Sequence, residues 1–465
     1  MTRSIEEIFS ITNIREVFDS YIKRSLSIGV DGISADSFAD NLDVESEIIH
    51  RKILNGSYRF SPYKEKLIIK SANSPPRSVK IPTIRDKLVL RIMLRELTKT
   101  FDGVVKQQCS ARTTISNVIN TFQSNDYDAF IKIDIEKFYP SINHEILFEI
   151  LDDQLNNDIF SRLIKASFTN RIQDVNRKNR SPDSLECGLP EGLSISGLLA
   201  NIYLYNIDSI YSEINDISYY RFVDDILLLC NISKKESVEK MLINEFDSIK
   251  LKVHPMGHDK DKSESGYINE GFQYLGYEFK EKLISVREKS LDRLYNRIVS
   301  YFVRSCKTSE IITIDKFYYG LNIRIAGLIR KNGDLIGWLA YYQNINNHTV
   351  LFSLDKFVER CCKRFDIVYD TTKIKKFSRA IYEVRRYPNT NYINDVNKAE
   401  KSIDISKLSG YGLSKHLNKA HHPENTEEKN DTLNNHELQK KLEEEYLANI
   451  DDQIYREVKY DTWEY

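Results

Sequence analysis

The most constraining feature of this sequence is a pair of acids, Asp224 and Asp225, between two short hydrophobic segments. Residues 219–223 and 226–230 have the length and composition of strands, so they predict a hairpin with the acids at its tight turn. A buried carboxylate without a partner is costly. The turn therefore needs solvent, a partner or a metal ion, and a hard cation such as Mg²⁺ prefers carboxylate oxygens.

The Asp-Asp dipeptide alone is weak, because it also occurs at residues 152–153 and 451–452. Those two pairs fall in helical and polar contexts, in which solvated surface is expected. A further acid, Asp134, ends the strand-like run 129–134. An Asp at that place is often only a helix cap. Two-metal phosphoryl transfer, however, needs a third carboxylate, and one acid from a neighbouring strand supplies it.

Composition describes an ordinary globular protein, with 41% hydrophobic and 29% charged residues among 465. No apolar run approaches the roughly 18 residues of a membrane span, so no membrane association is expected. The six cysteines are scattered without a C-x-x-C pair, which favours free thiols in the cytoplasm. The net charge of -1 hides basic clusters at 287–331 and 356–386. They are either solvated helix faces or a surface for phosphates.

Hydrophobic periodicity predicts helices and strands in mixed order, which indicates an α+β fold with a core sheet covered by helices. Strands are predicted at 66–70, 129–134, 219–230 (two strands and a turn) and 272–279. Helices are predicted at 4–18, 34–53, 82–98, 144–155, 192–207, from 291 onward, 314–328, 335–344, 354–365 and 436–448.

The two acid-bearing segments, 131–142 and 220–229, resemble motifs A and C of reverse transcriptases. The other motifs of that family follow in its order over roughly residues 55–285, which makes chance similarity very improbable. The segments concerned are 58–62 and 81–87 (fingers), 188–204 (motif B), 262–263 (motif D) and 272–277 (motif E).

This resemblance implies a right-hand polymerase with fingers, palm and a mainly α-helical thumb. The N-terminal extension and fingers would occupy residues 1–128, and the palm with motifs A to E residues 129–285. The helical thumb and C-terminal region would occupy residues 286–400, with interleaved basic and aromatic residues, most of the aromatics in the core. A polar, acidic tail would form residues 401–465.

The resemblance also implies the metal centre. Asp134, Asp224 and the backbone oxygen of Ile135 would hold two Mg²⁺ ions, or Mn²⁺, with Asp225 supporting them. Lys70 and Arg77 lie where the fingers contact the incoming triphosphate, and solvated loop charges are the alternative. Lys262 lies where the family places a lysine that donates a proton to pyrophosphate, although the nearby Lys260 competes for that alignment.

Two further positions concern the nucleotide. Tyr139 lies where the family places an aromatic ring under the incoming sugar, which would exclude a 2′-hydroxyl; a core aromatic is the alternative. Gly192 would allow close approach of the backbone to the nascent base pair. Glu191 departs from the usual glutamine of motif B, and an ionised glutamate cannot donate a hydrogen bond. Residues 196–197 and Phe222 depart too, from Ser-Pro and tyrosine, and none of the departures removes a metal ligand.

The resemblance therefore implies an RNA-directed DNA polymerase. The compact length of the sequence and its motif B favour an antiphage defence enzyme that works with a non-coding RNA template, dNTPs and a DNA product. A homo-oligomer or a partner protein is compatible with it. The alternatives are a retron or intron-type reverse transcriptase, an RNA-binding scaffold or maturase, and an RNA-dependent RNA polymerase.

Overall fold

The computed structural model divides the chain into two compact units, Met1–Tyr267 and Ile268–Tyr465. The structure describes residues 3–68, 76–155, 157–170, 172–174, 177–180, 186–257, 262–307, 314–329 and 335–386. The predictions for Lys70, Lys260, the helix at 436–448 and the tail from 401 fall outside these residues. The predicted boundary between palm and thumb, at residue 286, stays a prediction.

The first unit opens with helices that pack against the long helix α5 (Ile84–Thr100) or against a neighbour that does. They are α1 (Ile5–Ile8), α2 (Ile11–Val17), the π-helix η1 (Phe18–Ile22), α3 (Ala35–Ala39) and α4 (Leu42–Leu54). The predicted single helices at 4–18 and 34–53 were wrong, because each is interrupted. The Ser10 side chain caps α2 by accepting a hydrogen bond from the backbone N–H of Asn13, so a new helix starts there.

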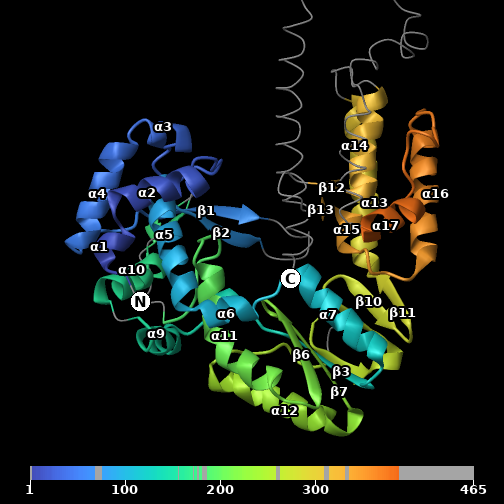
Figure 1. Cartoon of the computed structure of the whole chain (residues 1–465), viewed down its shortest axis with the longest axis horizontal. Coiled ribbons are helices and arrows are strands. Elements are labelled where there is room, and N and C mark those ends of the chain that lie inside the picture. The colour runs from blue at the N-terminus through green and yellow to red at the C-terminus, as the bar shows by residue number, and fades with distance from the viewer. Residues whose placement is uncertain are drawn as a thin grey trace, which may run out of the picture. The chain divides into compact units, whose positions relative to one another are not determined.

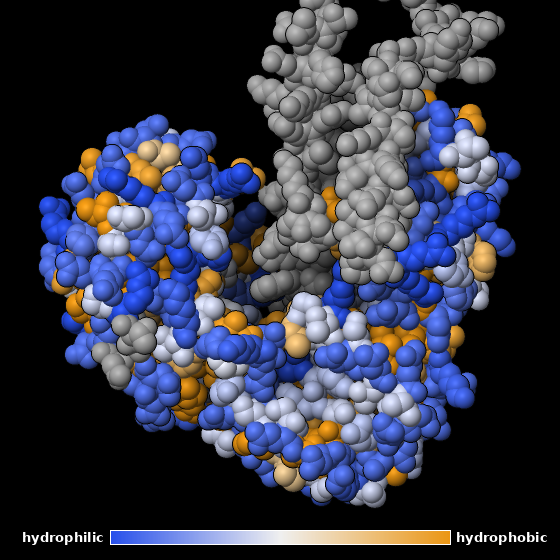
Figure 2. Space-filling view, in the orientation of Figure 1, coloured by the Kyte–Doolittle hydropathy of each residue, from blue (hydrophilic) through white to orange (hydrophobic). Residues whose placement is uncertain are grey.

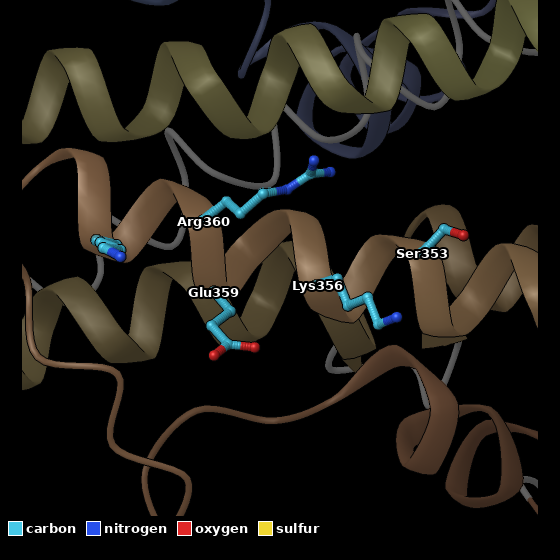
Figure 3. Close-up of a pocket in the computed structure, with 5 residues that line it drawn as sticks. Ser353, Lys356, Glu359 and Arg360 are labelled. Carbon is cyan, nitrogen blue, oxygen red and sulfur yellow. The ribbon is translucent and has the colours of Figure 1, made fainter.

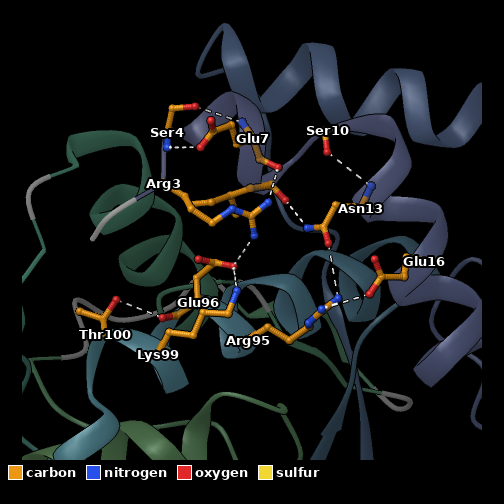
Figure 4. Close-up of polar contacts among 11 residues, drawn as sticks. Arg3, Ser4, Glu7, Ser10, Asn13, Glu16, Arg95, Glu96, Lys99 and Thr100 are labelled. Carbon is orange, nitrogen blue, oxygen red and sulfur yellow. Dashed lines mark hydrogen bonds and ion pairs between the residues drawn. The ribbon is translucent and has the colours of Figure 1, made fainter.

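Charged side chains fasten the N-terminus to α5 (Figure 4). Glu96 on α5 accepts hydrogen bonds from Arg3 at 3.0 Å and from Lys99 at 2.8 Å. Arg95, one residue earlier, donates to Glu16 on α2 at 3.1 Å. The N-terminal extension is thus part of the first unit and not a separate arm.

The first sheet of this unit has the strand order β2-β1-β4-β5. Its strands are β1 (Tyr63–Ile68), β2 (Arg77–Ile81), β4 (Ile172–Asp174) and β5 (Arg177–Arg180). β1 and β2 form an antiparallel hairpin, and β1 pairs with β4 in parallel. The predicted strand at 66–70 begins earlier, at Tyr63, whose side chain is fully buried.

The second sheet has the order β6-β7-β3-β8 and carries the three predicted metal-binding acids. Its strands are β3 (Ala129–Asp134), β6 (Ile217–Phe222), β7 (Asp225–Cys230) and β8 (Glu264–Tyr267). The helices α7 (Ala111–Ser124), α11 (Ser196–Ser212) and α12 (Ile232–Ser248) contact its strands (Figure 1). Every residue of β7 is buried, so both faces of the sheet are covered there.

The remaining helices of the first unit are short: α6 (Asp102–Gln107), α8 (Phe138–Ser141), α9 (His144–Asp152) and α10 (Asp158–Phe168). The predicted strand at 129–134 and the predicted hairpin at 219–230 are confirmed. The predicted start of a helix at residue 192 was wrong, because α11 begins at Ser196. Gly192 has φ +103°, which no helical residue adopts, so it lies in a loop.

The second unit joins a three-stranded antiparallel sheet to helices. Its elements are η2 (Ile268–Glu270), β9 (Phe272–Tyr274), β10 (Tyr277–Lys280), β11 (Leu283–Val286), α13 (Glu288–Lys307), α14 (Ile314–Ala326), β12 (Leu328–Ile329), β13 (Leu335–Ile336), α15 (Trp338–Tyr341), α16 (His348–Arg364) and α17 (Phe377–Arg386). The single strand predicted at 272–279 is two strands, because Leu275 and Gly276 turn the chain with positive φ. The helix predicted at 335–344 is a short strand and one helical turn, separated by Gly337.

Side-chain burial agrees with a mainly structural role for the aromatic residues of the second unit. Phe302, Phe317, Trp338 and Tyr342 are buried, whereas Tyr319 is 47% exposed. The visible surface is mostly hydrophilic, and its apolar residues are scattered (Figure 2). None of the described helices has the length and apolar character of a membrane span. The predicted α+β class is confirmed.

Candidate active site

The backbone register brings the predicted acids to one end of the second sheet. β3 and β7 are antiparallel, and Asp134 is directly opposite Asp225. β6 and β7 are joined by the two-residue turn Val223-Asp224, which places Asp224 next to this pair. Three carboxylates, from β3, from β7 and from the β6–β7 turn, therefore gather at one edge, as the sequence predicted.

The turn is conformationally unusual. Val223 has φ +59°, in the left-handed region that β-branched residues rarely adopt. Such a residue costs roughly 1–3 kcal/mol and persists only when its surroundings hold it. The sequence shows no glycine here, so the strain is visible only in the structure. It lies immediately before the two acids.

The three acids differ in burial and contacts. Asp225 is only 4% exposed, whereas Asp224 is half-buried. Asp134 accepts a hydrogen bond from Lys262 Nζ at 2.7 Å, and its backbone N–H donates to Ser263 Oγ at 3.1 Å. The predicted motif D lysine, Lys262, thus forms an ion pair with the motif A carboxylate of Asp134.

His254 is a site residue that the sequence did not indicate. Its Nε2 lies 3.4 Å from Asp134 Oδ2, and its Nδ1 lies 3.7 Å from Glu136 Oε1. Its backbone N–H donates to the carbonyl oxygen of Asp134 at 3.0 Å. Ile135, the predicted backbone ligand, forms an isolated bridge with Val253. The segment 252–254 therefore runs beside motif A and supports it.

The donor set fits divalent cations in chemistry. Within the described part of the chain, no three His, Cys, Asp or Glu side chains are already close enough together to form a metal site. Carboxylate oxygens at adjacent strand ends are the ligands that Mg²⁺ uses. Lys262 instead neutralises one of them, and a bound cation would take over that role.

Tyr139 lies among charges that come from several elements. Its phenol is about 3.9 Å from the position that a Cβ on Gly197 would occupy, at the start of α11. Burial, and then the nearby charge of Asp224, raise the pKa of Tyr139 to about 12. Arg77 and Glu191 also act on this phenol, with opposite signs. The Tyr139 ring therefore lies near the turn that carries Asp224 and near Arg77 of β2.

Residues 190–195, the motif B loop, lie against the fingers strand β2. The Lys80 amide donates to the Glu191 carbonyl oxygen at 2.7 Å. Arg77 Nε donates to the Glu191 carboxylate, and both side chains are about one-fifth to one-quarter exposed. A Cβ on Gly192 would lie 2.5 Å from the Lys80 carbonyl oxygen. The absence of a side chain at Gly192 thus allows this close contact with β2.

A buried polar network behind the turn was also missed by the sequence reasoning. Arg221 on β6 pairs with Asp208 on α11, and their side chains are 3% and 5% exposed. Tyr219 Oη donates to Asp208 Oδ1 at 2.8 Å. The only signal in the sequence was a charged residue inside each of two apolar segments.

The structure thus brings together Asp134, Asp224, Asp225, Tyr139 and Lys262. It also brings Arg77, Glu191 and Gly192 together at the contact between β2 and the motif B loop. What each residue does in a reaction stays a prediction.

A basic face lies on α16 in the second unit (Figure 3). Lys356, Arg360 and Lys363 are four and three residues apart along it, and they line a shallow pocket together with Ser353 and Glu359. Residues at this spacing share one face of a helix. Such a face offers several cations to a phosphate backbone without reading sequence.

Comparison with known proteins concerns the segment that carries the three acids. Residues 68–279 match a family model described as reverse transcriptase (RNA-dependent DNA polymerase). The protein YkfC of Escherichia coli (strain K12) is 22% identical over 294 residues, which cover 54% of this chain and 74% of that protein.

The group II intron-encoded protein LtrA of Lactococcus lactis subsp. cremoris is 27% identical over 185 residues. That alignment covers 37% of this chain and only 29% of LtrA. Among solved structures, apo telomerase from Candida Tropicalis aligns with a TM-score of 0.41 at 12% identity. It covers 66% of this chain and 59% of that chain.

Proposed function

We propose that residues 68–279, which match the reverse transcriptase family model, act as an RNA-directed DNA polymerase, and that the chain copies an associated non-coding RNA into DNA in antiphage defence. The reaction would take place in the cytoplasm. The observation that carries the enzymatic part is the β3–β7 register, which sets Asp134 opposite Asp225 with Asp224 in the adjoining turn. A scaffold has no need of three carboxylates at one sheet edge.

We propose that Asp134, Asp224 and the backbone oxygen of Ile135 hold two Mg²⁺ ions, or Mn²⁺, with Asp225 in support. When bound, such ions activate a 3′-hydroxyl and stabilise the leaving pyrophosphate. The chain's own contribution is to fix the carboxylates on a buried sheet. We propose that Lys262, whose Nζ lies 2.7 Å from Asp134 Oδ2, donates a proton to pyrophosphate.

For the nucleotide, the proposal gives Tyr139 the role of excluding a 2′-hydroxyl and Arg77 that of meeting the triphosphate. Both predictions gain support from position, because Tyr139 lies close enough to Asp224 and Arg77 for their charges to shift its pKa. Glu191 neutralises Arg77 in the absence of nucleotide. The triphosphate must therefore compete with a carboxylate that enzymes with glutamine at this position lack.

The template and product would bind through cationic faces such as that of α16, with Lys356, Arg360 and Lys363. Phosphate contacts give affinity that falls with salt. The antiphage role rests on the Glu-Gly motif B, by resemblance alone. A second candidate, an intron-type enzyme, is favoured by the similarity to LtrA.

The test is the double substitution Asp224→Ala/Asp225→Ala in the full chain. We expect DNA synthesis from dNTPs to be lost while RNA binding is retained, and NTPs to be poor substrates for the unaltered protein. Asp152→Ala/Asp153→Ala is a matched control, because it removes the same dipeptide at the exposed end of α9. Undiminished biological function in the Asp224/Asp225 variant would refute the enzyme and favour a scaffold.

Sequencing the nucleic acid that co-purifies with the protein separates the defence enzyme from the intron-type enzyme. The defence proposal expects a short structured RNA and DNA complementary to it. Recovery of an intron RNA in its place would contradict that proposal and leave the polymerase intact.

A further inference from the structure

We propose that Arg221, anchored by Asp208, is a positioning residue that sets the turn carrying the acids of the second sheet. The inference rests on the proposed function in one respect, namely that these acids hold metal ions. The proposal assigns a role to two residues outside the metal centre: Arg221 on β6, the strand before the turn, and Asp208 on the motif B helix α11.

The ion pair between Arg221 and Asp208 is buried, and two hydrogen bonds join the side chains. Arg221 Nε donates to Asp208 Oδ1 at 2.7 Å, and Nη2 donates to Oδ2. Two parallel bonds of this kind fix the plane of the guanidinium as well as its place. Tyr219 Oη donates to the same Asp208 oxygen at 2.8 Å, which fixes the carboxylate in turn.

The remaining nitrogen reaches the turn itself. Arg221 Nη1 donates to the carbonyl oxygen of Val223 at 2.9 Å and to Asn201 Oδ1 at 3.1 Å. Val223 is the residue in the left-handed conformation, at φ +59°. A bond to its carbonyl oxygen holds the peptide that leads directly into Asp224. The strained conformation is therefore held by a side chain that α11 fixes from behind.

Arginine is suited to this task and lysine is not. A lysine ammonium presents a point charge and cannot bind the Asp208 carboxylate and the Val223 carbonyl in one plane. Asn201 and Asp208 are seven residues apart on α11, about two turns, so they lie on the same face. That helix follows the motif B loop, which links the support of the turn to the loop that contacts the fingers.

The experiment compares Arg221→Lys and Asp208→Asn with the unaltered full chain. Mn²⁺ binding followed by electron paramagnetic resonance is the main measurement, because it does not depend on synthesis. Residues that support metal ligands typically cost about 10- to 100-fold in metal affinity when altered. We expect a loss of about tenfold, a similar rise in the Mg²⁺ concentration for half-maximal primer extension, and retained folding by circular dichroism.

Arg85→Lys is the matched control. Arg85 forms an equally forked pair with Glu45, at 2.6 and 2.7 Å, at the start of α5. Its substitution should leave Mn²⁺ binding unchanged. Asp208→Asn keeps the shape of the side chain and one acceptor oxygen, so it replaces Arg221→Lys as the test if that variant does not fold. It should lose less Mn²⁺ affinity than Arg221→Lys.

A rescue distinguishes positioning from general stabilisation. Glycine adopts positive φ without help, so Val223→Gly should restore part of the Mn²⁺ affinity that Arg221→Lys loses. Mn²⁺ affinity that stays normal in folded Arg221→Lys overturns the proposal, and so does a loss that Val223→Gly does not relieve. Mn²⁺ binding that depends on Arg221 in a chain unable to make DNA would instead contradict the proposed function alone.

Discussion

The β6–β7 and β1–β2 hairpins of the first unit have strands of similar length and opposite environments. Every residue of β7 is buried, and the β6–β7 turn is held by a buried ion pair. In the β1–β2 hairpin most side chains are half-buried or exposed, and its contacts with the motif B loop use Lys80 and Arg77. The carboxylates are thus placed by the core, whereas the predicted triphosphate contact is placed by bonds that can be exchanged.

Truncating one leucine in each hairpin gives the largest expected contrast. Leu228 on β7 is fully buried and Leu67 on β1 is 58% exposed. Leu228→Ala should lower the free energy of unfolding by about 2–5 kcal/mol. Leu67→Ala should change it by less than about 0.5 kcal/mol. Urea unfolding measures both, and equal losses would break the comparison.

Gly192→Ala tests the contact between the β1–β2 hairpin and the motif B loop. A Cβ there would lie 2.5 Å from the Lys80 carbonyl oxygen, and φ +103° disfavours any side chain. We expect a loss of roughly 1–3 kcal/mol in the free energy of unfolding, measured by thermal denaturation. Gly257→Ala is the control, since its φ is also positive but its Cβ would meet nothing within 4 Å. Similar losses in both would mean that backbone strain alone is responsible.

Glu191→Gln removes the carboxylate that neutralises Arg77 but keeps the shape of the side chain. Because the pair is partly solvated, stability should change by less than about 1 kcal/mol. The KM for dNTPs should fall by roughly three- to tenfold, which corresponds to about 1 kcal/mol. Steady-state primer extension measures it, with Arg77→Gln expected to raise KM. If base selection, rate and KM all remain the same in Glu191→Gln, Glu191 has no part in nucleotide handling.

The smallest signal is the titration of Tyr139, which lies within reach of charges from both hairpins. Its pKa of about 12 exceeds the usual 10, so the unfolded chain ionises first. The stability that the protonated phenol contributes is present below pH 10 and is lost as the pH rises to about 12. The absorbance difference at about 295 nm between the unaltered chain and Tyr139→Phe should show no ionisation near pH 10. Asp224→Asn should lower this pKa, and Arg77→Gln should raise it.

The sequence predicted the buried hairpin better than the exposed one. Strong apolar runs at 129–134 and 219–230 leave one register in which the acids share an edge, so strands and site followed from pattern. The strand predicted at 66–70 was displaced, because its alternation is weak and its anchor, Tyr63, lies outside the apolar run.

Turns inside apolar segments account for some of the other failures. Leu275 adopts φ +45° before Gly276 inside an aromatic run that looks like one strand. Val223 also adopts positive φ, at +59°, inside the β6–β7 hairpin. The Arg221–Asp208 pair and His254 were not predictable either, because they meet through tertiary packing and not through spacing along the chain.

The bond from the Lys80 amide to the Glu191 carbonyl oxygen has a consequence for how this enzyme can diverge. A hydrogen bond between main-chain atoms does not depend on the side chain, so any substitution at Lys80 except proline keeps the donor. An inserted or deleted residue between Arg77 and Lys80 would instead move a different amide to that position and turn the strand over. Variation in this part of the fingers is therefore limited by length before it is limited by amino-acid identity.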